Sequence, residues 1–159
     1  MISWLRSLFT RLSGAKPAAK ASEPEIWNFL LKGDRKEIGA INDALERAAG
    51  AGEIPEAAFR AVQIALDELL TNALSYGQVS VQSPAKVDII LNNKSIRAVL
   101  TYQDVNFNPF TETEHPSLHA SIADREIGGL GVHLVKEMMD ECVHAYKDGH
   151  NVLSVTKHF

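Results

Sequence analysis

The sequence predicts an α/β (α+β) sandwich of two layers, in which a mixed or antiparallel sheet is covered on one face by three helices. The expected elements follow the order β-α-α-β-β-loop-α-β-β, and the strands come in pairs rather than in strict βαβ alternation. A chain of 159 residues fits one domain and is long enough to bury a real core. These observations together predict the fold class.

The first half of the domain is expected to hold one strand and two helices. An apolar run over residues 25–31 predicts the first strand. Asp34 is expected to cap a helix that runs to about Ala49, because an aspartate side chain can accept hydrogen bonds from the first free N–H groups. Pro55 fits the first turn of a longer helix, which carries a broad apolar stripe and ends near Gly77.

The second half is expected to hold two hairpins, a loop and a helix. Four runs have the composition of strands and pair around short turns: residues 87–91, 96–102, 142–146 and 152–156. Residues 106–127 lose all periodicity, and a loop of this length, roughly twenty residues, is usually functional or mobile. A third helix is expected from the glycine-rich run at Gly128 through Asp140.

Charge and cysteine content exclude several classes of protein. Four of the 16 basic residues lie within residues 1–20, which contain no acidic residue, so the remainder carries 12 basic against 20 acidic residues. An acidic body argues against direct binding of nucleic acid, which needs phosphate neutralisation. A single cysteine, Cys142, excludes an internal disulfide and suits a reducing compartment, so we expect a cytoplasmic protein.

Residues 1–24 are expected to lie outside the domain, which then covers residues 25–159. Within residues 1–12 the apolar side chains share one helical face, which predicts an amphipathic helix that could contact the inner membrane surface. A partner-binding helix or a frayed terminus fits the same pattern. Residues 13–24 have the composition of a linker, and no apolar run is long enough to span a bilayer.

The glycine-rich run is the first candidate site. Three glycines, Gly128, Gly129 and Gly131, lead directly into a segment with helical spacing of apolar residues. Glycine allows a tight turn and close approach of backbone N–H groups, and the N-terminus of a helix favours an anion. This pattern indicates a phosphate-binding turn, although a plain turn before a helix has the same pattern.

The second candidate site lies in the long helix. Glu68 and Asn72 are four residues apart and therefore share one helical face. An asparagine oxygen suits Mg²⁺, and a carboxylate one turn away can orient or deprotonate a hydroxyl that attacks a phosphate. The same spacing is common on solvated helix faces.

Together the two sites resemble a known family. Residues 68–73 (Glu-Leu-Leu-Thr-Asn-Ala) are similar to the N-box, and residues 128–131 (Gly-Gly-Leu-Gly) to the glycine box, of the GHKL (Bergerat-fold) ATP-binding superfamily. Within it, residues 125–141 and 148–157 resemble bacterial anti-sigma-factor serine/threonine kinases. The resemblance runs from about residue 25 to the end of the chain.

The resemblance implies an ATP site between the long helix and a lid formed by residues 106–127, with Mg²⁺ on Asn72 and Glu68 as the catalytic base. It implies nucleotide contacts by Asn72, Asp104, Asn106, Gly128, Gly129, Leu130, Gly131 and Val132. Arg125 lies just before the glycine-rich run, where its guanidinium could reach a phosphate or an acidic partner, although a solvated loop arginine fits the same position. The phosphate acceptor would be a serine of a STAS-type anti-anti-sigma partner, which would compete with a sigma factor for this protein. Many members of the family are dimers, so a homodimer is implied as well.

One family motif is altered. The expected pattern after the first hairpin is D-x-G-x-x-F-[DN]-P, in which the aspartate accepts the adenine amino group. Residues 102–109 retain Phe-Asn-Pro but lack the glycine, and the spacing from Asp104 to Phe107 is too short. Asp104 can still serve, with Asn106 in place of the glycine, because asparagine tolerates a positive φ better than most residues.

Three functions are therefore compared. The first is a serine kinase that takes part in partner switching. The second, motivated by the missing glycine, is an ATP-sensing or nucleotide-independent switch that binds a partner without phosphorylating it. The third is a histidine-kinase catalytic domain, which is disfavoured because the chain has no room for a dimerising helix pair with a phospho-acceptor histidine.

Overall fold

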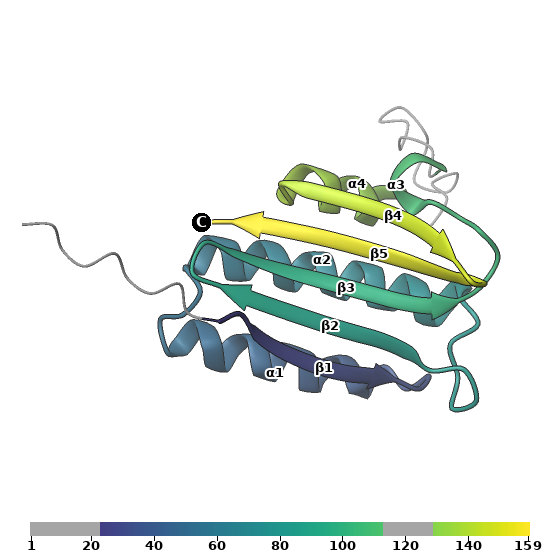
Figure 1. Ribbon diagram of the computed structural model, residues 1–159, viewed down its shortest axis with the longest axis horizontal. Helices are drawn as coiled ribbons and strands as arrows, with labels where there is room; N and C mark the ends of the chain where they lie inside the picture. Colours follow the sequence, from purple (N-terminus) through teal and green to yellow (C-terminus); the bar gives the residue numbers. More distant parts are fainter. Residues whose placement is uncertain (1–22, 113–128) are drawn as a thin grey trace, which may run out of the picture.

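The computed structural model describes residues 23–112 and 129–159. Figure 1 shows the elements in these two ranges. In chain order they are β1 (Glu25–Leu31), α1 (Lys36–Gly50), α2 (Glu56–Tyr76), β2 (Ala85–Asn92), β3 (Ser95–Gln103), α3 (Pro109–Glu112), α4 (Gly129–Met138), β4 (Glu141–Lys147) and β5 (His150–His158). The predicted amphipathic segment, residues 1–12, lies outside the described residues.

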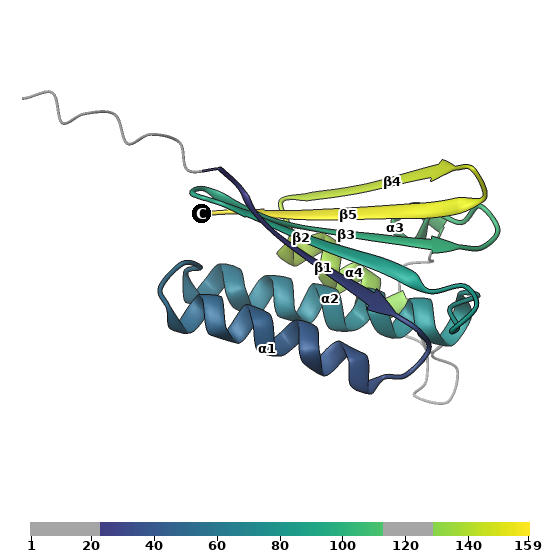
Figure 2. The same ribbon diagram turned by 60° about the horizontal axis from the view of Figure 1, so that its bottom comes forward.

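The strands form one five-stranded sheet with the order β1-β2-β3-β5-β4. Every neighbouring pair is antiparallel, which decides between the mixed and antiparallel sheets that the sequence allowed. Figures 1 and 2 show that the last hairpin, β4–β5, joins the sheet through β5, so that β4 forms one edge and β1 the other.

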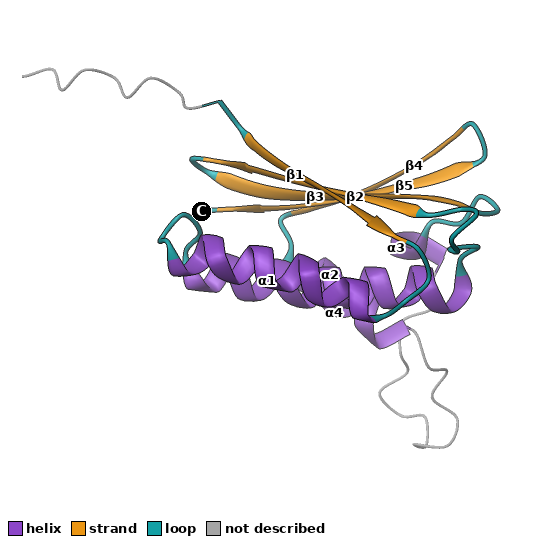
Figure 3. Ribbon diagram, turned by 90° about the horizontal axis from the view of Figure 1, so that it is seen from below, coloured by secondary structure: helices purple, strands orange, loops and turns teal. Residues whose placement is uncertain are grey.

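The helices lie on one face of this sheet, as predicted, and the core lies between the two layers (Figure 3). The predicted stripe on α2 is buried in full, from Phe59 to Ala73. Alternate residues of β2, including Val87 and Ile89, are fully buried in the same core. Each large side chain buried in this way contributes about 1.5–3 kcal/mol, so the amphipathic pattern accounts for the two layers.

The start of α1 differs by one position from the prediction. Arg35, rather than Asp34, is the N-cap residue, and its side chain makes no capping hydrogen bond. Asp34 still accepts a hydrogen bond, from the backbone N–H of Lys36 to Oδ1 at 2.9 Å. The tight turn from Asp34 to Glu37 moves the first helical residue one position on without removing this interaction.

The prediction that residues 106–127 form an uninterrupted loop is wrong at its start, because residues 109–112 form the short helix α3. Asn108 caps it: Oδ1 accepts the N–H of Phe110 at 3.0 Å, and the Asn108 N–H donates to Glu112 Oε1 at 2.7 Å. Pro109 then occupies the first helical position, where its lack of an N–H does no harm. Residues 113–128 lie outside the described residues.

The turn between β4 and β5 is a two-residue hairpin loop, as the sequence predicted. Asp148 and Gly149 both have positive φ, 53° and 78°, which matches the twist of the flanking strands. This hairpin places the start of β5 beside the end of β3, where Gln103 pairs with His150.

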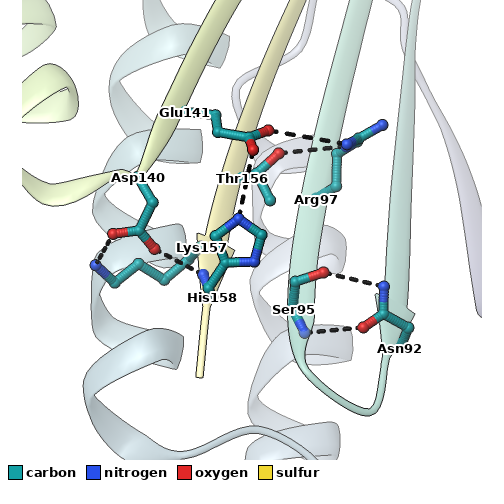
Figure 4. A network of polar contacts seen from close by, with 8 residues as sticks. All are labelled: Asn92, Ser95, Arg97, Asp140, Glu141, Thr156, Lys157 and His158. Carbon is teal, nitrogen blue, oxygen red and sulfur yellow. Dashed lines mark hydrogen bonds and ion pairs between the residues drawn. The ribbon is translucent and has the colours of Figure 1, made fainter.

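A polar network joins the end of α4 to the end of β5, on the side of the sheet away from the β4–β5 turn (Figure 4). Asp140 accepts hydrogen bonds from Lys157 Nζ at 3.0 Å and from the backbone N–H of His158 at 2.7 Å. These interactions, the backbone hydrogen bond first, lower the pKa of the Asp140 carboxyl from its usual value. Asp140 therefore anchors the C-terminal end of the helix whose first turn holds the glycine-rich run.

Candidate functional site

Glu68 and Gly131 come from different helices and meet where α2 packs against α4. A Cβ placed on Gly131 would overlap the Glu68 side chain, whose Oε2 would be its nearest neighbour and whose Cδ would lie 2.6 Å away. Gly131 does not have a positive φ, so the site needs glycine here for space rather than for backbone conformation. We refer to this pair as the carboxylate–glycine contact.

The adjacent carboxylate faces elsewhere. Asp67 Oδ1 accepts a hydrogen bond from Asn42 Nδ2 at 3.0 Å and so joins α2 to α1. Neighbouring residues on a helix point about 100° apart, so Asp67 faces α1 while Glu68 faces α4. Of these two carboxylates, Glu68 is the one that lies beside the glycine-rich run.

Asn72 lies one turn beyond Glu68 on α2 and is half-buried, as is Glu68. Both polar residues flank the buried stripe formed by Leu69, Leu70 and Ala73. Within residues 23–112 and 129–159, no group of three or more His, Cys, Asp and Glu side chains could hold a metal ion. A cation bound beside Asn72 would take the asparagine oxygen together with oxygens of a ligand, which is how Mg²⁺ commonly binds beside phosphates.

The glycine-rich run divides into parts with different environments. Gly129 begins α4. The Leu130 side chain is 62% exposed, whereas Val132 is 1% exposed and belongs to the core, so a ligand could meet Val132 only through its backbone. Gly128 and Arg125, both predicted to contact nucleotide, lie outside the described residues.

Asp104 and Asn106 lie in the segment after β3, and their environment differs from that of Glu68. The Asp104 carboxylate accepts the N–H of Val105 at 2.7 Å, and the Asp104 carbonyl accepts the hydroxyl of Tyr146 at 3.2 Å. The Asp104 N–H donates to Gly149 O at 3.4 Å. These contacts place Asp104 against the β4–β5 hairpin, and Asn106 is exposed.

A buried asparagine, Asn151, holds the same segment, and the sequence did not identify it. It is fully buried on β5, where its amide contacts the backbone of Val105 and Phe107. Strand alternation could have revealed it, because Asn151 is in phase with the buried Leu153 and Val155 and so points into the core. We call residues 104–107 the amide-held segment.

Tyr102 connects this segment with the end of α2. A Cβ on Gly77 would lie 3.1 Å from two atoms of the Tyr102 ring and 2.6 Å from the backbone oxygen of Ala73. The pKa of the Tyr102 hydroxyl is raised, first by burial and second by the nearby Asp104 carboxylate. The ring therefore stays neutral and packs closely against Gly77.

Cys142 is half-buried near the start of β4. Burial raises the pKa of its thiol, while Lys136 opposes this to a smaller extent. The thiol stays protonated at neutral pH, so it is a packing group rather than a nucleophile.

The antiparallel sheet and its single helical layer are the arrangement expected for the GHKL class of ATP-binding domains. The profile of the histidine kinase-like ATPase domain family matches residues 31–157. The chain belongs to this family, and membership implies that it binds ATP. This confirms the predicted superfamily resemblance and the predicted fold class.

A solved structure of the RsbU and RsbW domains of Rv1364c from Mycobacterium tuberculosis shares the fold, with a TM-score of 0.58 and 11% sequence identity. The similarity covers 84% of this chain and 31% of the solved chain, so this protein spans about a third of that one. A search of curated proteins gave no significant match. Within the described residues, no helix is long and apolar enough to cross a membrane.

Proposed function

We propose that this protein is an ATP-dependent serine/threonine kinase that phosphorylates a serine of a STAS-type anti-anti-sigma partner. The observation that supports the proposal most is the carboxylate–glycine contact. It brings a potential base to the first turn of a helix, where unpaired backbone N–H groups favour phosphate oxygens.

The residues present suit both ATP and Mg²⁺. The absence of a Cβ at Gly131 lets the Glu68 carboxylate lie against the backbone of the first turn of α4, where free N–H groups favour phosphate oxygens. The Asn72 oxygen is a hard donor on the same helix as Glu68, as Mg²⁺ prefers. Bound Mg-ATP would supply the transferable phosphoryl group, with its charge balanced by the cation and by the N–H groups of α4.

The chain's own contribution is positioning and proton transfer. Glu68 would accept the proton of the acceptor serine hydroxyl, and Gly131 would let the carboxylate lie close to the first turn of α4. Asp67 keeps α2 fixed against α1 while this happens. Phosphoryl transfer asks for little covalent chemistry from the protein, so these placements would account for most of the catalysis.

The test compares Glu68→Gln with a matched control, Glu46→Gln. Glu46 is an exposed residue of α1. We expect Glu68→Gln to lower phosphate transfer from Mg-ATP to a STAS-domain protein by at least about a hundredfold and to leave the Kd for ATP within a few fold. The control should behave as the wild type. Transfer by Glu68→Gln at the wild-type rate would refute the role of the base.

A second candidate function is a switch that binds ATP, or a partner alone, without phosphate transfer. It is favoured by one observation: the Asp104 carboxylate already accepts a hydrogen bond from Val105, in a motif that lacks the family glycine. Calorimetry with Mg-ATP separates the candidates. Binding by the wild-type protein with no transfer to any STAS-domain serine would favour the switch.

The kinase proposal extends to partners and location. The unphosphorylated STAS partner would compete with a sigma factor for this protein, a homodimer would be the working unit, and the protein would be cytoplasmic with residues 1–12 at the inner membrane surface. Cosedimentation with anionic liposomes, before and after deletion of residues 1–20, tests the last point. Equal pelleting would refute anchoring by this segment.

A further inference from the structure

Three hydrogen bonds converge on the side chain of Asn151, which is 0% exposed. Its Nδ2 donates to the carbonyl of Val105 at 2.7 Å, and its Oδ1 accepts the N–H of Phe107 at 3.2 Å. The Nε2 of His144 lies 2.9 Å from the same oxygen. A buried amide with all these partners is tightly constrained, because losing any one of them leaves a buried polar group unpaired.

The orientation of this amide follows from its partners. A flipped side chain would place an NH₂ group against the Phe107 N–H and an oxygen against the Val105 carbonyl, so the flip is excluded. Since Oδ1 can only accept, His144 must donate from Nε2, and this fixes the tautomer of the neutral ring. Asn151 thus links β4, β5 and residues 105–107.

The segment that Asn151 holds has little other support from side-chain burial. Val105 is 69% exposed and Phe107 is 40% exposed, so neither side chain anchors it in the core. Its other hydrogen bonds are made by Asp104: the N–H donates to Gly149, the carbonyl accepts the Tyr146 hydroxyl, and the carboxylate accepts the Val105 N–H. The conformation of the segment therefore depends on the Asn151 amide.

We propose that Asn151 is a positioning residue for nucleotide recognition: it holds residues 105–107 so that the Asp104 carboxylate is placed to select adenine in a motif that lacks the family glycine. This inference rests on the proposed function, in which Asp104 accepts the adenine amino group. A carboxylate that accepts from that amino group would repel the O6 oxygen of guanine. Asn151 should therefore affect base selection more than phosphate transfer.

The experiment measures the Kd of Mg-ATP and Mg-GTP, and the transfer rate at saturating ATP, for the wild type and for Asn151→Asp. This substitution keeps the shape and the acceptor oxygen but removes the donor to Val105. We expect the Kd for ATP to rise about tenfold and the preference for ATP over GTP to shrink by a similar factor. The transfer rate at saturation should stay within twofold, because the carboxylate–glycine contact is untouched.

Thr156→Val is the matched control. Thr156 is also buried on β5, but its hydroxyl oxygen accepts a hydrogen bond from Arg97 at the far end of the strand, so nucleotide binding should not change (Figure 4).

Hydrogen exchange at the Phe107 amide is an independent measurement, and the exchange should become faster in Asn151→Asp. Should that variant fold poorly, His144→Leu removes one donor to Oδ1 and should weaken ATP selection in the same direction.

The outcomes separate this inference from the proposed function. A wild-type protein that binds no ATP would refute the proposed function and the inference with it. A wild type that binds and selects ATP, beside an Asn151→Asp variant with unchanged Kd and selectivity, would overturn only the inference. An equal loss for ATP and GTP would also overturn it, because this would show a general structural role.

Discussion

The carboxylate–glycine contact and the amide-held segment are built in different ways. Glu68 and Gly131 lie on two helices that pack through buried apolar stripes, and the glycine provides space for the carboxylate. Residues 104–107 lie in a connection whose apolar side chains are exposed, and the buried Asn151 amide holds them by hydrogen bonds. Helix packing fixes the first site, and a single side chain fixes much of the second.

The largest effect is expected from Gly131→Ala. The three atoms nearest to the new methyl group all belong to the flexible Glu68 side chain, which can move aside at little cost in stability. Displacing the proposed base should lower phosphate transfer by about a hundredfold, because small misplacements of a catalytic group have effects of this size. Transfer assays and thermal unfolding of the same variant measure both quantities.

Gly39→Ala is the control for this substitution, since a Cβ there has no neighbour within 4 Å. It should leave transfer unchanged and raise the free energy of unfolding by about 0.5–1 kcal/mol, because alanine is the better helix former. Normal transfer by Gly131→Ala would show that the position of the Glu68 carboxylate does not limit the reaction.

Gly77→Ala, in contrast to Gly131→Ala, should act mainly on the stability of the fold. Its Cβ would meet the backbone oxygen of Ala73 and the buried Tyr102 ring, neither of which can move freely. We expect a loss of about 1–3 kcal/mol in the free energy of unfolding, seen by urea or thermal denaturation. A destabilisation no larger than that of Gly131→Ala would contradict this difference between the two glycines.

Asn72→Ala tests the proposed cation site on α2. Removing the oxygen should weaken ATP binding about tenfold in the presence of Mg²⁺ and change it little in EDTA, because the amide would act only through the cation. Calorimetry under both conditions measures this. An equal loss with and without Mg²⁺ would assign Asn72 to direct nucleotide contact.

The smallest effect is expected at Asp140, which anchors the far end of α4 (Figure 4). Its pKa is lowered from 3.8 in the folded protein, so its contribution is present above that pH and disappears as the pH falls through the lowered value. Asp140→Asn should cost about 0.5–1 kcal/mol at pH 7 and nothing at strongly acid pH. Denaturation curves at both pH values test this, and an unchanged transfer rate is expected.

Much of the fold could be predicted because its signals are local. The buried stripe of α2, the strand pairs and the turn at Asp148 and Gly149 each depend on residues that are close in sequence. The short helix α3 was missed because it depends on reciprocal capping by Asn108 and Glu112 rather than on periodicity. The predicted cap of α1 at Asp34 was wrong by one residue for a similar reason, because a local hydrogen-bonded turn, and not periodicity, sets where this helix begins.

The sequence by itself determined the order of the elements, the layer that each apolar face joins and the two motifs that identify the family. Only the tertiary structure decided that Glu68 faces Gly131 while Asp67 faces Asn42, and that Asn151 holds residues 105–107. The physical reason is the separation along the chain of the residues that interact. Periodicity and turn preference act over a few residues, whereas these contacts join residues far apart in the chain that meet only when the sheet and helices pack.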